Sequence, residues 1–200
     1  MSDDGLVSRY LNRPLSRPVA RALSHTPAAP NVLTATTLLV AVVSAGMLAA
    51  GWNIAGGIAI QVVSVAEGVD GELARLKNMA TRFGAVFDST LDRYAEGLLF
   101  MGLSAYFARK RDYLKVALCG AAINGSFMVS YVRARAEGLG LDCKVGLLTR
   151  MERVFIILAM LITGLVVPGL WILVVGTHLT VIQRVWYVYR TLKQQGDDTR

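Results

Sequence analysis

The chain has 200 residues, a net charge of +7, 54% hydrophobic residues and 18% charged residues. Soluble domains are about 45–50% apolar and about 25% charged, so this composition excludes an ordinary soluble domain and predicts contact with a lipid bilayer. The length fits one domain. The positive charge favours an anionic membrane surface or an anionic substrate, and no nucleic-acid partner is expected because long apolar runs dominate the sequence.

Residues 1–29 are predicted to lie outside the membrane core. Arginine recurs at every fourth position, at Arg9, Arg13, Arg17 and Arg21, with apolar residues in between. This spacing predicts a short amphipathic helix that lies on anionic lipid head groups. Two prolines interrupt the pattern.

Six mainly apolar runs follow, and about 20 such residues can cross a bilayer as a helix. The runs cover residues 32–50, 54–66, 83–108, 113–132, 154–167 and 170–189. The sequence therefore predicts an all-α polytopic membrane protein with six transmembrane helices and an N-terminal interfacial helix. We expect the membrane domain over residues 30–192 and a polar C-terminal tail over 193–200.

Lys and Arg residues concentrate in the N-terminal segment, after the second and fourth runs, and near the C-terminus. Cytoplasmic loops of membrane proteins are rich in these residues. The connection after the third run breaks the pattern with Arg109, Lys110, Arg111 and Lys115. We expect a multi-pass protein of the cell membrane, with both termini and the active site on the cytoplasmic side.

Five acidic residues lie within or beside the apolar runs, at Glu67, Asp70, Asp88, Asp92 and Glu96. Acidic side chains are costly in a bilayer and usually have a function there. Spacings of three and four residues place the first four acids on one face of each of two helices. Clustered carboxylates repel one another unless cations lie between them, and oxygen ligands favour Mg²⁺ or Mn²⁺. A buried ion pair with a nearby arginine is the alternative for any single acid.

The residues between the two acidic pairs fit a nucleotide. Gly71 leaves room for a close approach of backbone or ligand, and Ala74 lies one turn after Asp70 on the same helix face. Arg75 supplies positive charge for phosphates, and Gly84 lies beside the expected cations. A small transporter or cation channel is an alternative, but ion conduction does not need this spacing.

The segment from Glu67 to Asp92 resembles the signature of the CDP-alcohol phosphotransferase family, D-x-x-D-G-x-x-A-R-x8-G-x3-D-x3-D. Every fixed position matches except the first, where this chain has Glu67 in place of aspartate. The resemblance implies a helical membrane enzyme in which an acceptor hydroxyl attacks the β-phosphorus of a CDP-alcohol and CMP leaves. It also implies two Mg²⁺ or Mn²⁺ ions that neutralise the pyrophosphate.

The same resemblance implies roles for the matched residues. The metal ligands would be Glu67, Asp70, Asp88 and Asp92, and Asp92 would also act as the general base. The start of the first apolar run, Pro30-Asn31-x-x-Thr34, also resembles the family. Contacts with the CDP part would come from Asn31, Thr34, Gly71, Ala74, Arg75 and Gly84.

Glu67 is the one departure from the pattern. Its extra methylene moves the carboxylate by about 1.5 Å, the length of one C–C bond, and Mg²⁺ tolerates geometric change poorly. Three interpretations stay open: an adapted site, a weakened or engineered variant, or a contact with the nucleotide through water. A catalytically impaired homologue is therefore one alternative.

Four further residues are predicted to lie on the same side of the membrane as the acids, and they suit a phosphate group on the acceptor: Ser130, Arg133, Arg150 and Arg153. Arginines in cytoplasmic loops also occur for topology alone. The segment resembles members that use inositol 1-phosphate, with CDP-diacylglycerol as donor in phosphatidylinositol phosphate synthase and CDP-inositol in di-myo-inositol phosphate phosphate synthase. An enzyme that uses glycerol 3-phosphate and makes phosphatidylglycerophosphate is the alternative.

A homodimer is also implied, because members of this family are commonly dimeric. The sequence itself offers only small residues on apolar faces, such as Gly97 and Gly102. Such residues bring helices together either between two chains or within one chain.

Overall fold

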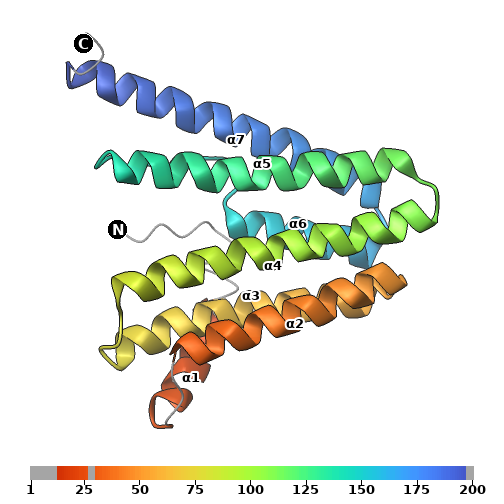
Figure 1. Ribbon diagram of the computed structural model, residues 1–200, viewed down its shortest axis with the longest axis horizontal. Helices are drawn as coiled ribbons and strands as arrows, with labels where there is room; N and C mark the ends of the chain where they lie inside the picture. The colour runs from red at the N-terminus through yellow and green to blue at the C-terminus, as the bar shows by residue number, and fades with distance from the viewer. Residues whose placement is uncertain (1–12, 27–29, 197–200) are drawn as a thin grey trace.

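The structure is a computed structural model that describes residues 13–26 and 30–196, and this part of the chain is helical. Its helices are α1 (Arg13–Ser24), α2 (Pro30–Ala50), α3 (Asn53–Leu76), α4 (Arg82–Arg109), α5 (Tyr113–Gly138), α6 (Arg150–Thr163) and α7 (Val166–Gln194). The long helices run roughly along one direction, with α2 packed on α3 and α4, and α5 packed on α7 (Figure 1). The predicted all-α class is confirmed.

Among the described residues, four helices are long and apolar enough to cross a membrane, namely α2 over Val32–Ala50, α3, α5 and α7. The prediction of six transmembrane helices is therefore wrong. Helix α6 has 14 residues, which at 1.5 Å per residue gives about 21 Å, shorter than a bilayer core of about 30 Å. Helix α4 has 28 residues, but it carries Asp88, Asp92, Arg93 and Glu96.

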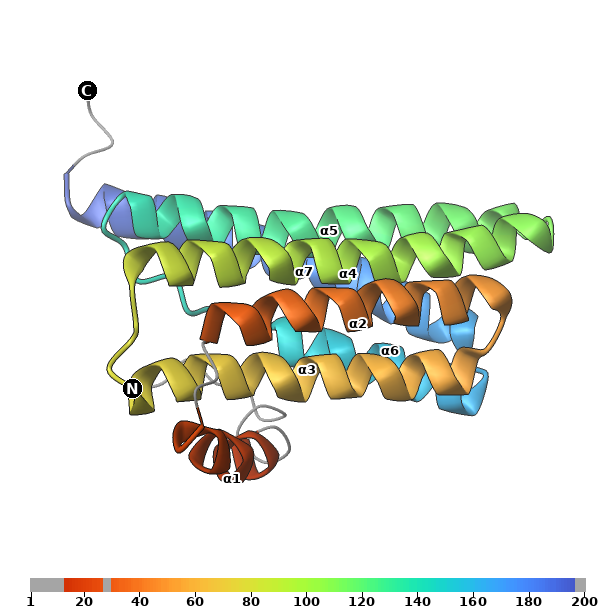
Figure 2. The same cartoon turned by 60° about the horizontal axis from the view of Figure 1, so that its bottom comes forward.

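The predicted N-terminal helix is present as α1, which packs on α3 and lies across one end of the bundle (Figure 2). Ser16 and Ala20 are buried, whereas Arg17, Val19 and Arg21 are exposed. The helix thus has a buried and an exposed face, although Pro18 lies inside it. Arg9 falls outside the described residues, and a position of α1 on lipid head groups stays a prediction.

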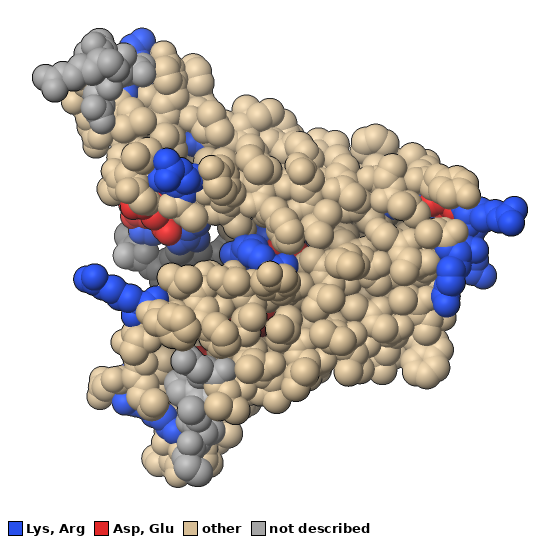
Figure 3. Space-filling model, in the orientation of Figure 1, with Lys and Arg blue, Asp and Glu red and all other residues tan. Residues whose placement is uncertain are grey.

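The surface between the two ends of the bundle is apolar. Large side chains point outward there: Leu39 is 66% exposed, Met101 65% and Ile182 63%. Lys and Arg gather toward the ends of the long axis, with a mostly uncharged surface between them (Figure 3). A soluble protein would leave few such residues in contact with water. This surface, together with the four apolar helices, makes the chain a multi-pass membrane protein.

Short connections make consecutive helices antiparallel. Gly51 ends α2 with a φ of 91°, a value that glycine adopts without strain. Asp112 caps α5 by accepting a hydrogen bond from the Lys115 backbone N–H at 3.2 Å. As a result, the last turns of α3 and the first turns of α4 lie at the same end of the bundle.

The apolar core fills the half of the bundle away from the end where α3 and α4 meet. Its fully buried side chains come from α2, α4, α5, α6 and α7 and include Leu48, Phe100, Leu103, Cys119, Ile157, Leu170 and Leu173. Helices α2 and α4 approach closely at Gly102, where a Cβ would come within 3.0 Å of the Cα of Ala45. Gly97 packs similarly, with a Cβ position 3.4 Å from Phe127 of α5. Both glycines therefore pack helices within one chain.

We expect Gly102→Ala to lower the free energy of unfolding by about 1–3 kcal/mol, because the added methyl group overpacks the α2–α4 contact. Gly120→Ala is the matched control, since a Cβ at Gly120 of α5 has no neighbour within 4 Å and alanine favours a helix. Thermal unfolding of the purified proteins in detergent measures both. Equal midpoints would contradict the close approach of α2 and α4.

Candidate active site

The two acidic pairs meet at one end of the bundle. Glu67 and Asp70 lie in the last turns of α3, and Asp88 and Asp92 lie in the first turns of α4. Thr81 fixes the start of α4 by accepting a hydrogen bond from the Gly84 backbone N–H at 2.9 Å. The short connection over residues 77–81 thereby places both acidic pairs near the same end of the bundle.

A cavity of about 230 Å³ opens beside the acids. It is lined by Thr34, Asp70, Gly71, Ala74, Arg75, Met79, Ala80, Thr81, Gly84, Ala85 and Asp88. The structure thus brings together five of the six residues expected to contact the nucleotide, along with two of the expected metal ligands. The sixth, Asn31, lies in the first turn of α2, and its side chain is outside the described part.

Asp70 is held in a fixed orientation at the inner wall of this cavity. Its side chain is 2% exposed; Oδ2 accepts a hydrogen bond from Thr34 Oγ1 at 2.7 Å, and Oδ1 accepts one from the Gly71 backbone N–H at 2.6 Å. Thr34 comes from α2 and Gly71 from α3, so two helices define the carboxylate position. Arg75 at the cavity rim is paired with Glu72 at 2.7 Å.

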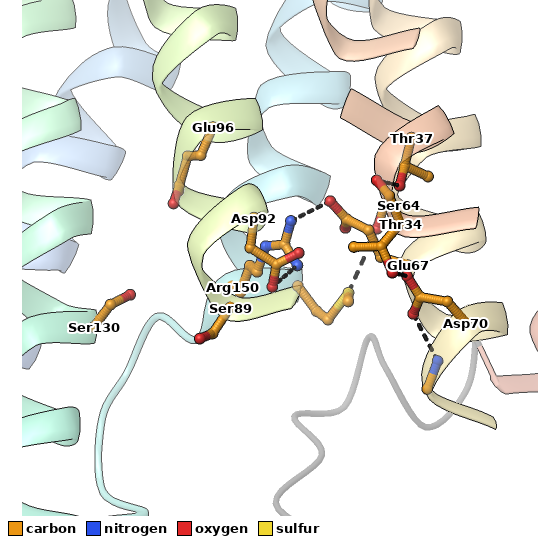
Figure 4. Close-up of polar contacts among 12 residues, drawn as sticks. Thr34, Thr37, Ser64, Glu67, Asp70, Ser89, Asp92, Glu96, Ser130 and Arg150 are labelled. Carbon is orange, nitrogen blue, oxygen red and sulfur yellow. Dashed lines mark hydrogen bonds and ion pairs between the residues drawn. The ribbon is translucent and has the colours of Figure 1, made fainter. Parts of the chain in front are cut away.

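Arg150 lies between the carboxylates of the two helices (Figure 4). Its Nη2 donates a hydrogen bond to Glu67 Oε1, and its Nη1 lies 2.6 Å from Asp92 Oδ2. Arg150 is the first residue of α6, and a capping box between Thr149 and Glu152 fixes that helix end. The guanidinium therefore occupies a position between α3 and α4 where a cation stabilises both acids.

The donor set fits a hard divalent cation. Carboxylate oxygens of aspartate and glutamate are the donors that α3 and α4 bring to this end, and Mg²⁺ and Mn²⁺ prefer such ligands. Glu67 Oε2 and Asp88 Oδ1 are buried and have no hydrogen-bond partner among the described residues. Such orphaned acceptors are unfavourable unless a cation or water binds them. With Arg150 in place, no three acids in the described ranges are arranged around one ion position.

The residues predicted for the acceptor do not form one cluster. Arg133 pairs with Glu137 on α5 at 2.8 Å, and Ser130 donates to the Ser126 carbonyl at 3.3 Å. Arg153 is 1% exposed and binds both oxygens of Glu96, at 2.7 and 3.1 Å. Their part in acceptor binding stays a prediction.

Sequence reasoning missed the two arginine–glutamate pairs between α6 and the preceding helices. Glu96 stood out as an acid in an apolar run, and Arg153 as a basic residue at a helix start, but no spacing rule joins them. The only signal was chemical: a buried carboxylate requires a cation. Several cavity residues, such as Met79 and Thr81, were also missed, because they lie in the eight positions between Arg75 and Gly84 that the signature leaves unspecified.

Comparisons with known proteins place this arrangement in a family. An archaetidylinositol phosphate synthase of Methanothermobacter thermautotrophicus is 34% identical over 188 residues, which cover 90% of this chain and 94% of the relative. A bifunctional IPC transferase and DIPP synthase of Aquifex aeolicus is 33% identical over 196 residues, which cover 94% of this chain. The chain matches 45% of that longer protein.

A solved structure shares the fold. The crystal structure of Mycobacterium tuberculosis phosphatidylinositol phosphate synthase with CDP-DAG bound superposes with a TM-score of 0.80 at 32% identity, covering 88% of this chain and 94% of the other. The same enzyme in complex with manganese and citrate gives a TM-score of 0.79 at 32% identity, covering 87% and 88%. Residues 28–183 match the CDP-alcohol phosphatidyltransferase family. The chain belongs to this family, whose members are CDP-alcohol phosphotransferases that depend on a divalent metal ion.

Proposed function

We propose that the chain transfers the phosphoalcohol group of a CDP-alcohol to inositol 1-phosphate and releases CMP. The observation that carries this proposal is the cavity that joins the acids of α3 and α4 to the nucleotide residues of the family signature. Two relatives that match most of this chain are named archaetidylinositol phosphate synthase and phosphatidylinositol phosphate synthase, which supports an inositol phosphate as the acceptor.

The CDP part binds in the cavity beside Asp70. Gly71 and Gly84 have no side chains that would fill the cavity, and the small Ala74 leaves space for the base. Arg75 lies at the rim near the phosphates.

Two Mg²⁺ or Mn²⁺ ions, held by Glu67, Asp70, Asp88 and Asp92, supply neutralisation of the pyrophosphate charge when bound. Asp92 accepts the proton of the attacking hydroxyl. The new bond joins that oxygen to the β-phosphorus, and the bond from this phosphorus to the bridging oxygen of CMP breaks. Thr34 and the Gly71 N–H keep Asp70 in place during these steps.

A second cavity favours a donor with lipid chains over soluble CDP-inositol. It has a volume of about 540 Å³ and lies among α1, α2, α3 and α6. Its lining is almost entirely apolar and includes Leu23, Leu33, Val62, Val65, Val69 and Leu158. Leu33 and Val69 lie in the same helix turns as Thr34 and Asp70, so this cavity is close enough to the acids for the acyl chains and the pyrophosphate of one donor to occupy both sites.

The end of the bundle with the acids faces the cytoplasm. Basic residues of α3, α5, α6 and α7 lie at this end, whereas the opposite end carries Arg109, Lys110, Arg111 and Lys115. The larger share of positive charge supports a cytoplasmic position for the end with the acids. Both termini then lie on the cytoplasmic side, with α1 on the head groups of that leaflet. Association into a homodimer is a further expectation, and it rests on family resemblance alone.

The direct test of this function is CMP release by purified protein with Mg²⁺, inositol 1-phosphate, and either CDP-diacylglycerol or CDP-inositol. We expect release that requires both substrates and is faster with the lipid donor. Release with glycerol 3-phosphate in place of inositol 1-phosphate would contradict the acceptor. No release with any donor, from protein that binds CDP, would indicate an impaired homologue.

Asp92→Asn removes the proposed base and keeps the side-chain shape. Turnover should fall by about 10²–10⁴-fold, the usual contribution of general-base catalysis, while CDP still binds. Asp112→Asn at the opposite end of the bundle is the matched control, because asparagine also caps helices. Full turnover by the Asp92 variant would remove this residue from the reaction.

Arg153→Met leaves Glu96 buried without its cation, so we expect a loss of about 3–5 kcal/mol in the free energy of unfolding. The double change Arg153→Met/Glu96→Gln should recover much of this loss and still show a raised KM for inositol 1-phosphate. Thermal unfolding and steady-state kinetics separate the two effects. A normal acceptor KM in the double variant would make Arg153 purely structural.

A further inference from the structure

Arg150 occupies a place that the proposed reaction does not explain. Its guanidinium reaches two carboxylates on different helices, Glu67 on α3 and Asp92 on α4 (Figure 4). The side chain of Arg150 is 19% exposed, that of Glu67 6% and that of Asp92 12%. These pairs are therefore largely shielded from water, where ion pairs are stronger than at the surface.

We propose that Arg150 is a built-in counter-ion of the metal site, which holds Glu67 and Asp92 in the metal-free chain and is displaced when a divalent ion binds. This inference rests on the proposed function, because it takes the acidic cluster as the metal site. It assigns Arg150 a role in addition to the acceptor binding expected from the sequence.

Competition follows from the atoms involved. Asp92 Oδ2 lies 2.6 Å from Arg150 Nη1, so this oxygen cannot coordinate an ion while the guanidinium keeps its position. A divalent ion and a guanidinium also repel each other at such distances. Glu67 Oε2 and Asp88 Oδ1 have no partner in the described structure and are available for the first contact with the ion.

Glu67 makes this arrangement specific to the present sequence. The family signature has aspartate at its position, and the extra methylene of glutamate extends the carboxylate by about 1.5 Å. In the structure, that carboxylate meets Arg150. We infer that Glu67 is a positioning residue for the arginine as well as a metal ligand, so the departure from the signature strengthens the hold on Arg150.

The displacement needs only side-chain rotation. The backbone of Arg150 is anchored by the capping box of α6, in which the Thr149 backbone N–H donates to Glu152 Oε2 at 3.0 Å. A freed guanidinium remains at the same end of the bundle, where it suits the phosphate of the acceptor. Metal binding and acceptor binding then favour each other, as linkage between two sites requires.

The test is a titration of the substrate-free, full-length protein with Mn²⁺ in detergent, with free Mn²⁺ measured by electron paramagnetic resonance. Arg150→Met should bind Mn²⁺ about tenfold more tightly than the wild type, because the ion no longer has to break two charge-assisted hydrogen bonds. Arg135→Met is the control: this exposed arginine lies on α5, and its loss should change the affinity little. Equal or weaker Mn²⁺ binding by the Arg150 variant overturns the proposal.

Glu67→Asp provides a second variant that keeps every charge. It withdraws one partner from Arg150, so Mn²⁺ should bind more tightly and should raise the unfolding temperature more than in the wild type. Weaker binding by this variant overturns the role of Glu67. A wild-type protein that binds no Mn²⁺ contradicts the metal site of the proposed function itself, whereas unchanged affinity in both variants contradicts only the counter-ion.

Discussion

Buried negative charge must be matched by positive charge, and this requirement organises the end of the bundle that holds the acids. Five acidic side chains lie on the facing ends of α3 and α4, where little water reaches them. An uncompensated carboxylate in such a place is costly. Helix α6 supplies the compensation: Arg150 pairs with Glu67 and Asp92, and Arg153 pairs with Glu96.

The same requirement explains how the bundle is divided. The half away from the acids is filled by leucine, isoleucine and phenylalanine side chains and by close contacts at glycines such as Gly102. The other half contains ion pairs, the nucleotide cavity and its rim. Helix α4 belongs to both halves, because residues 97–108 carry no charge and the residues before them include Asp88, Asp92 and Glu96. Hydropathy alone therefore misjudges this helix. A rigid apolar half gives the acids a fixed frame, which metal coordination and in-line displacement require.

Much of the site could be predicted from the sequence because helical spacing fixes which residues share a face. The pairs Glu67/Asp70 and Asp88/Asp92 and the small residues between them lie on two consecutive helices joined by a short connection, so local geometry alone brings them together. Thr34 was placed from resemblance to the family, and its hydrogen bond to Asp70 agrees with that placement.

The remaining features depend on contacts between distant parts of the chain. Arg150 follows Glu67 by 83 residues, and no local pattern distinguishes an arginine that holds a carboxylate from one that meets a phosphate or marks a cytoplasmic loop. The prediction of six spans was wrong because apolar runs were counted without weighing the length of α6 and the charges of α4. The pairing of Arg150 was missed because it is a tertiary contact, whereas the number of spans was wrong because hydropathy was read without helix length and charge.

The most direct measurement is a structure of the full chain with Mn²⁺ and CDP, in which anomalous scattering locates the metal. The account predicts Mn²⁺ bound by Glu67, Asp70, Asp88 and Asp92, CDP in the cavity beside Gly71, and the Arg150 guanidinium withdrawn from Glu67 and Asp92. Manganese bound elsewhere, or CDP outside that cavity, would contradict the assignment of this acidic cluster as the catalytic site.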